Sequence, residues 1–307
     1  MPNADTEKIY QLILGYHGPT KRVIAEGLRR AFRFDASLPP DYYPDVSRRE
    51  RRIPGAEAGQ EIRCLVYTPS VPNPPVLLYI HGGGWSLESS DDYASFHKKL
   101  SSMAGLLIFA IDYRLAPEHP FPAGLEDCLA AYRWLRRHAS ELGADPRRLF
   151  VGGDSAGGNL SPALALKLKE VAEPLPEALL CLCPVTDFQL EKYDSWRRLA
   201  FDGIVYDAAF LGAVRGGYVN CDAWTHPLVS PIYGDLRGLP PTCLIAGDED
   251  PLVDDNRAFA AKLREAGVAL DFKVYEDMPH AFYCFSGLIP QEQAALEQMT
   301  RFFRGHS

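Results

Sequence analysis

The chain has 307 residues, of which 47% are hydrophobic and 11% aromatic, so it can bury a large core and is neither disordered nor a small disulfide-stapled protein. Forty acidic side chains outnumber 32 Lys and Arg, and the resulting net charge of -8 argues against nucleic acid as a partner. The longest apolar run, residues 105–111, falls far short of the roughly 20 residues that span a bilayer, so we expect no membrane span.

Two features of the sequence indicate the cellular compartment, namely the N-terminus and the cysteines. Residues 1–8 lack the basic and apolar regions of a signal peptide, which predicts a cytoplasmic protein. The seven cysteines are odd in number, show no C-x-x-C spacing and mostly have apolar neighbours. We therefore expect buried thiols rather than disulfides or a metal site.

From about residue 61 onward, short apolar or alternating runs recur between helical patterns. This alternation is typical of βαβ units and predicts an α/β fold with a largely parallel sheet. The expected strands are 61–68, 76–80, 105–111, 149–152, 178–183, 242–246 and 270–275, with 46–53 as a candidate polar edge strand. Apolar residues at helical spacing predict helices around 125–135, 159–171, 259–266 and 296–303.

The sequence Gly153-Asp154-Ser155-Ala156-Gly157 lies between an expected strand and an expected helix. This is the G-x-S-x-G pattern in the context that a nucleophile elbow requires, because small residues around the serine tolerate a sharp strand-to-helix turn. We predict Ser155 as the nucleophile. The alternative is a glycine-rich turn with a helix-capping serine.

A second glycine-rich segment, His81-Gly82-Gly83-Gly84-Trp85, directly follows the expected strand 76–80. Consecutive glycines leave backbone N–H groups accessible, as an oxyanion hole requires. We predict that the N–H groups of Gly82, Gly83 and Ala156 bind the oxyanion, and that His81 anchors the loop. The alternative is a phosphate loop, but neither glycine cluster completes a nucleotide-binding pattern.

A serine nucleophile needs a base, and in this type of site the triad runs Ser, acid, His along the chain. His226 precedes the best acidic candidates and His306 is the penultimate residue, which leaves His280, in the loop after the expected strand 270–275. The alternative for His280 is a packed or solvated side chain. Because the base must be neutral and an unperturbed His titrates near about 6.5, activity should be lost at low pH.

Five carboxylates compete for the role of the acid after the expected strand 242–246. Active-site residues collect at strand ends in open α/β sheets. Spacing does not choose among Asp248, Glu249 and Asp250, whereas Asp254 and Asp255 are expected to cap the following helix.

Four segments together, residues 81–85, 112–123, 153–158 and 250–252, resemble the bacterial hormone-sensitive-lipase-like esterases of the α/β-hydrolase superfamily. They occur in the family's order, and the resemblance covers about residues 45–305. It implies the α/β-hydrolase fold, a mostly parallel sheet flanked by helices, with a helical cap. It also implies Asp250 as the triad acid, with Asp248 as runner-up, and structural roles for Arg114 and Glu118. Ala281 departs from the family, which usually has glycine after the base.

The resemblance further implies a domain division. Residues 1–45 would form an N-terminal helical cap segment, and residues 46–307 the catalytic domain, with an aromatic-rich cap insertion at about 188–225. Whether that insertion serves as core packing or as a substrate lid stays open.

The implied activity is that of a serine carboxylesterase acting on short- to medium-chain acyl esters, with a small-molecule ester as its partner and no metal or organic cofactor. Trp85 and Phe282 are candidates for lining the substrate pocket. A homodimer paired through the edge strand 270–275 is a further implication. The alternatives are a ligand-binding receptor relative without activity, and a lactonase, peptidase or amidase that uses the same triad.

Overall fold

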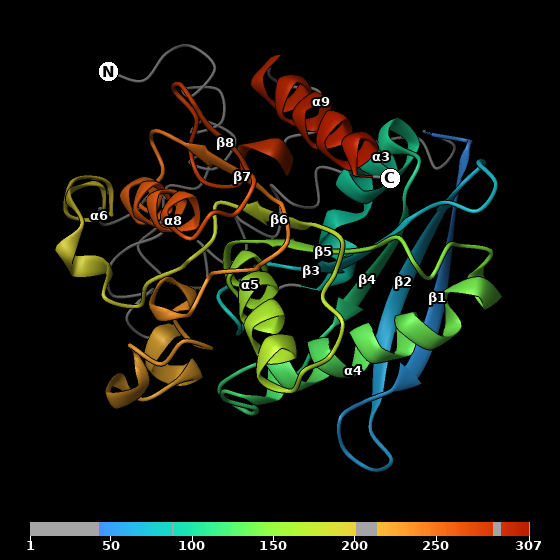
Figure 1. The fold of residues 1–307 in the computed structure, drawn as a ribbon, viewed down its shortest axis with the longest axis horizontal. Coiled ribbons are helices and arrows are strands. Elements are labelled where there is room, and N and C mark those ends of the chain that lie inside the picture. Colours follow the sequence, from blue (N-terminus) through green and yellow to red (C-terminus); the bar gives the residue numbers. More distant parts are fainter. Residues whose placement is uncertain (1–42, 88, 201–213, 285–289, 307) are drawn as a thin grey trace, which may run out of the picture.

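In the computed structural model, which describes residues 43–87, 89–200, 214–284 and 290–306, eight strands form one sheet (Figure 1). The strand order is β1-β2-β4-β3-β5-β6-β7-β8. Only the pairs β1/β2 and β2/β4 are antiparallel, and the other five pairs are parallel. The predicted fold class is therefore confirmed. The strands are β1 (Val46–Pro54), β2 (Glu61–Pro69), β3 (Val76–Ile80), β4 (Leu107–Asp112), β5 (Leu149–Asp154), β6 (Leu179–Leu182), β7 (Thr242–Gly247) and β8 (Leu270–Tyr275).

Each expected strand is present, and β3 and β8 have the predicted bounds. The other six strands differ from the predicted bounds by one or two residues at one or both ends, and two of these differences have a clear local reason. β4 starts at Leu107 because Gly105, with a φ of 69°, ends the preceding helix in the left-handed conformation. β5 continues to Asp154 because Gly153 and Asp154 still pair with residues of β6.

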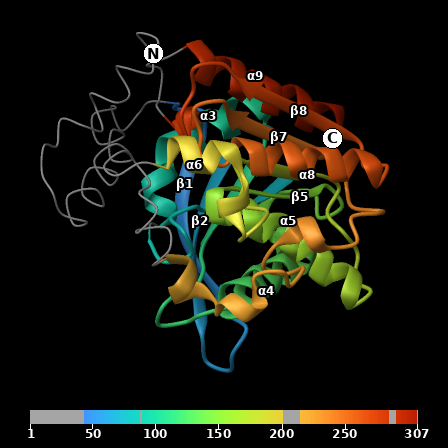
Figure 2. The ribbon, with the colours of Figure 1, turned by 90° about the vertical axis from the view of Figure 1, so that its left-hand side faces the viewer.

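The helices cover both faces of the sheet. One core cluster joins α3 and α9 to the sheet, and the other joins α4, α5 and α8 to it. Figure 1 shows α3 and α9 on one side of the strands and α4 and α5 on the other, and Figure 2 shows the same layers from the side. The α-helices whose bounds are described are α3 (Ala94–Ala104), α4 (Ala123–His138), α5 (Ser155–Glu170), α6 (Asp194–Leu199), α8 (Val253–Glu265) and α9 (Pro290–Gly305). Short 3-10 helices are η2 (Ser90–Tyr93), η3 (Ala139–Leu142), η4 (Leu190–Lys192), η5 (Cys221–Ala223), η6 (Pro231–Tyr233) and η7 (Phe282–Cys284).

Most of the predicted N-terminal cap segment, and the central part of the predicted cap insertion, lie outside the described residues. The domain division therefore stays a prediction. Among the described helices, none is both long and apolar enough to cross a membrane. All seven cysteines are free thiols, and five of them are buried.

The carboxyl ends of the parallel strands meet at one edge of the sheet, where active sites of open α/β sheets form. β3 and β5 are neighbours in register, with Ile80 opposite Gly153. β7 and β8 are also neighbours, with Gly247 opposite Tyr275. The loops that carry the predicted site residues therefore leave the sheet at the same edge.

Candidate active site

Ser155 lies at the turn between β5 and α5, where it is the first residue of the helix. Its φ of 52° is in the left-handed region, which is unusual for a residue other than glycine and is typical of a strained functional turn. Gly153 and Gly157 permit this turn, because a Cβ atom at either position would overlap the carbonyl oxygen of Ile80. The absence of side chains at these two positions lets the elbow lie directly against the end of β3.

The predicted base and the predicted acid are in direct contact. The Nδ1 atom of His280 lies 2.7 Å from Oδ2 of Asp250, and both residues are buried. Oδ1 of Asp250 accepts a hydrogen bond of 2.9 Å from the backbone N–H of Leu252, which fixes the carboxylate. Asp248 has a different partner, since its Oδ1 accepts from the backbone N–H of Met278 at 3.2 Å. The structure thus brings Asp250, and not Asp248, to the imidazole.

The segment after β6 lies between the imidazole and the elbow. Sγ of Cys183 is 3.6 Å from Nε2 of His280, and the N–H of Val185 donates to the carbonyl of Ser155 at 3.4 Å. Burial raises the pKa of Asp154, the residue before Ser155, and the charge of His280 is among the smaller influences that oppose this rise. The Nε2 side of His280 therefore faces the end of the sheet that carries Ser155.

The loop of Asp250 is held by α8 and α6. Asp255, fully buried in the first turn of α8, accepts from the backbone N–H and the hydroxyl of Thr186 at 2.7 and 2.5 Å. Ser195 donates to the carbonyl of Pro251 at 2.8 Å, and its N–H donates to Asp254 at 2.9 Å. The prediction that Asp254 and Asp255 cap the helix was wrong, because the helix starts at Val253 with Leu252 at the N-cap. These carboxylates join distant segments instead.

The glycine loop is fixed by its carbonyl groups. The hydroxyl of Tyr113 lies 3.1 Å from the carbonyl oxygen of His81 and 3.2 Å from that of Gly82. The carbonyl of Gly83 accepts from Ser86 and Leu87. The His81 ring stacks on Tyr113 at a centroid distance of 4.4 Å, as expected of an anchor.

The N–H of Gly82 is already engaged, since it donates to the hydroxyl of Tyr93 at 3.2 Å. This contact corrects our choice of Gly82 as an oxyanion donor. Gly83 and Gly84 have φ values of 84° and 60°, and within the described part of the chain their N–H groups make no recorded hydrogen bond. Ala156, next to Ser155, is buried at the start of α5, and its role as an oxyanion donor stays a prediction.

The two candidate pocket residues lie in different surroundings. Trp85 stacks on Tyr218 with a centroid distance of 4.6 Å and packs against Phe188 at 4.9 Å. It therefore joins the glycine loop to the segment after β6 and to the segment around residue 218. Phe282 is 1% exposed and packs against Tyr275 in the core beneath α9. The packing of Phe282 gives no support to its choice as a pocket residue.

Among the described residues, one cluster of side chains has atoms of the kinds that bind metal ions close together. The ligand atoms of Cys183, Asp250 and His280 all lie within 4.8 Å of one another. Asp250 is engaged by the imidazole, and burial raises the pKa of the Cys183 thiol, which keeps the sulfur protonated. The donor set fits proton transfer at His280 better than it fits a cation site.

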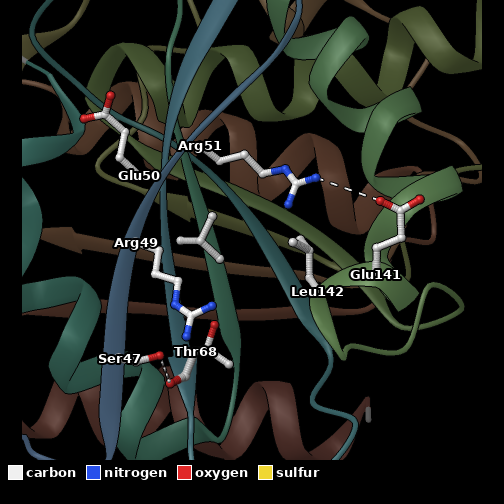
Figure 3. Close-up of a pocket in the computed structure, with 8 residues that line it drawn as sticks. Ser47, Arg49, Glu50, Arg51, Thr68, Glu141 and Leu142 are labelled. Carbon is white, nitrogen blue, oxygen red and sulfur yellow. Dashed lines mark hydrogen bonds and ion pairs between the residues drawn. The ribbon is translucent and has the colours of Figure 1, made fainter.

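Two surface pockets lie apart from these loops. One, with a volume of about 280 Å³, lies on β1 and β2 and is lined by charged side chains such as Arg49 and Arg51, the latter 3.9 Å from Glu141 (Figure 3). The other, of about 600 Å³, lies between α4 and the turn after β1. Neither is lined by Ser155, Asp250 or His280.

Comparison with known proteins gives consistent matches. A family model described as alpha/beta hydrolase fold matches residues 77–284. Carboxylesterase NlhH of Mycobacterium tuberculosis is 34% identical over 293 residues, which cover 93% of this chain and 91% of the relative. Ethyl acetate hydrolase of Pseudomonas putida is 31% identical, over 94% of this chain and 92% of the relative.

Among solved structures, the esterase of Pyrobaculum calidifontis superposes with a TM-score of 0.88 at 26% identity, covering 99% of both chains. The mostly parallel eight-stranded sheet described above agrees with these matches. The chain therefore belongs to the α/β-hydrolase family, among its hormone-sensitive-lipase-like carboxylic ester hydrolases.

Proposed function

We propose that this chain is a serine carboxylesterase in which Ser155 is the nucleophile, His280 the base and Asp250 the acid. The observation that carries the proposal is the 2.7 Å contact between the buried Nδ1 of His280 and Oδ2 of Asp250. A carboxylate in this position selects the imidazole tautomer that keeps the proton on Nδ1 and leaves Nε2 as the acceptor. It also stabilises the imidazolium that forms when Nε2 takes the serine proton.

The reaction proceeds in two halves. Ser155 Oγ attacks the ester carbonyl while Nε2 of His280 accepts its proton, and the same proton is then donated to the leaving alcohol. A water molecule, deprotonated by His280, next attacks the acyl-enzyme. The bond between the acyl carbon and Oγ then breaks, His280 returns the proton to Ser155, and the carboxylic acid is released. In both halves the oxyanion accepts hydrogen bonds from backbone N–H groups, for which we propose Gly83, Gly84 and Ala156.

We propose short- to medium-chain acyl esters as substrates. Trp85 directly follows the oxyanion loop, and its ring is enclosed by Tyr218 and Phe188. We infer that this aromatic cluster, which directly follows the glycine loop, limits the length of the acyl chain that fits. One relative is named for ethyl acetate, an ester with a two-carbon acyl group, which supports the same size class.

The test is hydrolysis of p-nitrophenyl esters from acetate to palmitate. The expected result is activity that peaks at short chains and falls by about a millionfold in Ser155→Ala. Ser161→Ala is a matched control on the same helix, because its hydroxyl donates to the carbonyl of Gly157 and takes no part in the proposed reaction. Rates that rise through long-chain esters would contradict the proposed substrate size.

The alternatives predict other outcomes of the same series. A folded wild-type protein without activity on any ester would favour a ligand-binding role. Faster cleavage of a lactone or an amide than of the ester with the same acyl group would favour a lactonase or an amidase.

We also propose that two copies pair through β8. This strand pairs with β7 on one side, and the described part of the sheet has no strand on its other side. Exposed strand edges pair readily with a second chain. Light scattering after size exclusion should give twice the mass of the chain, and a monomer at all concentrations would contradict this proposal.

A further inference from the structure

The carboxylate of Asp154, the residue before the nucleophile, is buried and satisfied by two tyrosines. Its Oδ1 accepts from the hydroxyl of Tyr79 at 2.8 Å, and its Oδ2 accepts from the hydroxyl of Tyr93 at 2.9 Å. Burial raises the pKa of Asp154 to about 6, and the two tyrosine hydrogen bonds oppose this rise. The carboxyl group is therefore ionised at neutral pH.

An ionised carboxylate only accepts hydrogen bonds, which fixes the direction of the contacts around it. Tyr93 must donate its single hydroxyl proton to Asp154, so its oxygen is left to accept the N–H of Gly82 at 3.2 Å. The carboxylate also lies against Gly82 directly. A Cβ atom there would overlap Oδ2 of Asp154 and lie 2.9 Å from the Tyr93 hydroxyl oxygen.

These contacts join two parts of the proposed site that are separate in the sequence. Asp154 ends β5 immediately before the elbow, Tyr93 ends η2, and Gly82 begins the oxyanion loop after β3. Neither Asp154 nor Tyr93 takes part in the proposed acyl transfer.

We propose that Asp154 and Tyr93 are positioning residues that hold the oxyanion loop, through the N–H of Gly82, in the geometry that binds the transition state. We call this pair of residues the Asp154–Tyr93 clamp. The proposal rests on the proposed esterase function. It gives a role to Asp154, which lies between Gly153 and Ser155 in the elbow and is not a member of the triad.

The physical argument concerns the peptide groups that follow Gly82. Tyr113 holds the carbonyl of Gly82, and Tyr93 holds its N–H, so this residue is fixed on both sides. The next peptide N–H groups, of Gly83 and Gly84, are those proposed to bind the oxyanion. Donors that are already oriented stabilise the transition state without reorganisation, and the loss of one oxyanion donor costs about a hundredfold or more in turnover.

The chain offers a matched pair of variants. Tyr93→Phe removes the link to Gly82 and one hydrogen bond to Asp154, and it keeps the aromatic ring. Tyr79→Phe removes one hydrogen bond to the same carboxylate but none to the loop. For Tyr93→Phe we expect kcat on a p-nitrophenyl ester to fall by about tenfold to a hundredfold, with KM changed less than about threefold. For Tyr79→Phe we expect kcat to change less than about threefold.

A reversible boronic acid that forms a tetrahedral adduct with the serine supplies a second readout. Its affinity should fall in Tyr93→Phe by the same factor as kcat/KM, because both report stabilisation of the oxyanion. A variant that is damaged only in its folding would lower the active fraction without changing the inhibition constant. Thermal unfolding of each variant checks that it is folded under assay conditions.

Asp154→Ala removes the acceptor of Tyr93 and completes a double-mutant cycle. If Asp154 and Tyr93 act as one unit, the double variant loses little more than the larger single loss. Equal losses in Tyr79→Phe and Tyr93→Phe, a change in KM alone, or additive losses in the cycle would overturn the clamp. Failure of the proposed function is distinguishable, because the wild-type protein itself would then not hydrolyse esters.

Discussion

His280 and Asp250 are 30 residues apart in the chain, and their Nδ1 and Oδ2 atoms are 2.7 Å apart in the structure. Their loops follow β8 and β7, which are adjacent parallel strands with Gly247 opposite Tyr275. The strand register therefore delivers both side chains to one point. The backbone N–H of Leu252, which donates to the other oxygen of Asp250, fixes the carboxylate in line with the imidazole.

This contact predicts that substitutions at two neighbouring aspartates have different effects on kcat. Asp250→Asn should lower kcat by about 10⁴-fold, because an amide no longer selects the productive tautomer or stabilises the imidazolium. Asp248→Asn is the matched control, since Asp248 contacts the N–H of Met278 and not the imidazole. Steady-state kinetics of both variants on one short ester test this prediction. A comparable loss of kcat in Asp248→Asn would contradict the assignment of Asp250 as the acid.

The elbow predicts a stability difference between two glycines. A Cβ atom at Gly157 would overlap the carbonyl of Ile80 and lie 2.6 Å from that of His81, and backbone groups cannot move aside easily. Gly157→Ala should therefore lower the free energy of unfolding by about 3 kcal/mol or more. Gly216→Ala, which lies in a helical turn where a Cβ would meet nothing within 4 Å, should not lower it and should raise it by up to about 1 kcal/mol. Urea unfolding of both variants tests this, and similar stabilities would contradict the close approach of the elbow to β3.

The close approach of Gly84 to Val214 predicts that activity lost by a substitution at one position is partly restored by a substitution at the other. At Gly84 a Cβ atom would lie 2.6 Å from Cγ1 of Val214, and the φ of 60° disfavours any side chain. Gly84→Ala should reduce kcat by about a hundredfold, because the loop must move out of its donor geometry. Adding Val214→Ala removes the clash and leaves only the backbone strain of about 1–2 kcal/mol, so the double variant should recover part of the lost kcat. A double variant no faster than the single one would mean that the loop does not contact Val214 as described.

The buried carboxylate beside the nucleophile predicts a pH-dependent difference in stability. Burial raises the pKa of Asp154 from 3.8 to about 6 in the folded protein, so the folded state holds this proton more tightly than the unfolded state does. The contribution of Asp154 to stability is thus fully present below pH 4 and is lost as the pH rises to about 6. The loss amounts to about 3 kcal/mol.

Asp154→Asn, a neutral analogue of the protonated acid, should show no such loss. The free energy of unfolding of the variant relative to wild type should rise by about 2 kcal/mol between pH 4 and pH 6.5, as measured by urea unfolding at each pH. A difference that is constant with pH would contradict the raised pKa.

The sequence by itself determined the features that depend on local patterns. Apolar periodicity located the strands, because burial on one or both faces of a sheet imposes its own spacing. The small residues around Ser155 and the three glycines after His81 were visible as well, because a sharp turn and an accessible backbone both require the absence of side chains. The family, and with it the hydrolase class, followed from these segments and their order.

The tertiary structure alone decided which groups meet. From the sequence without the resemblance, Asp248, Glu249 and Asp250 were equivalent, and strand register singled out the one that reaches His280. Gly82 was chosen as an oxyanion donor, yet its N–H binds Tyr93. Phe282, chosen for the pocket, is packed in the core against Tyr275. Contacts of this kind depend on residues far apart in the chain, and their partners are fixed only when the strands pair and the helices pack.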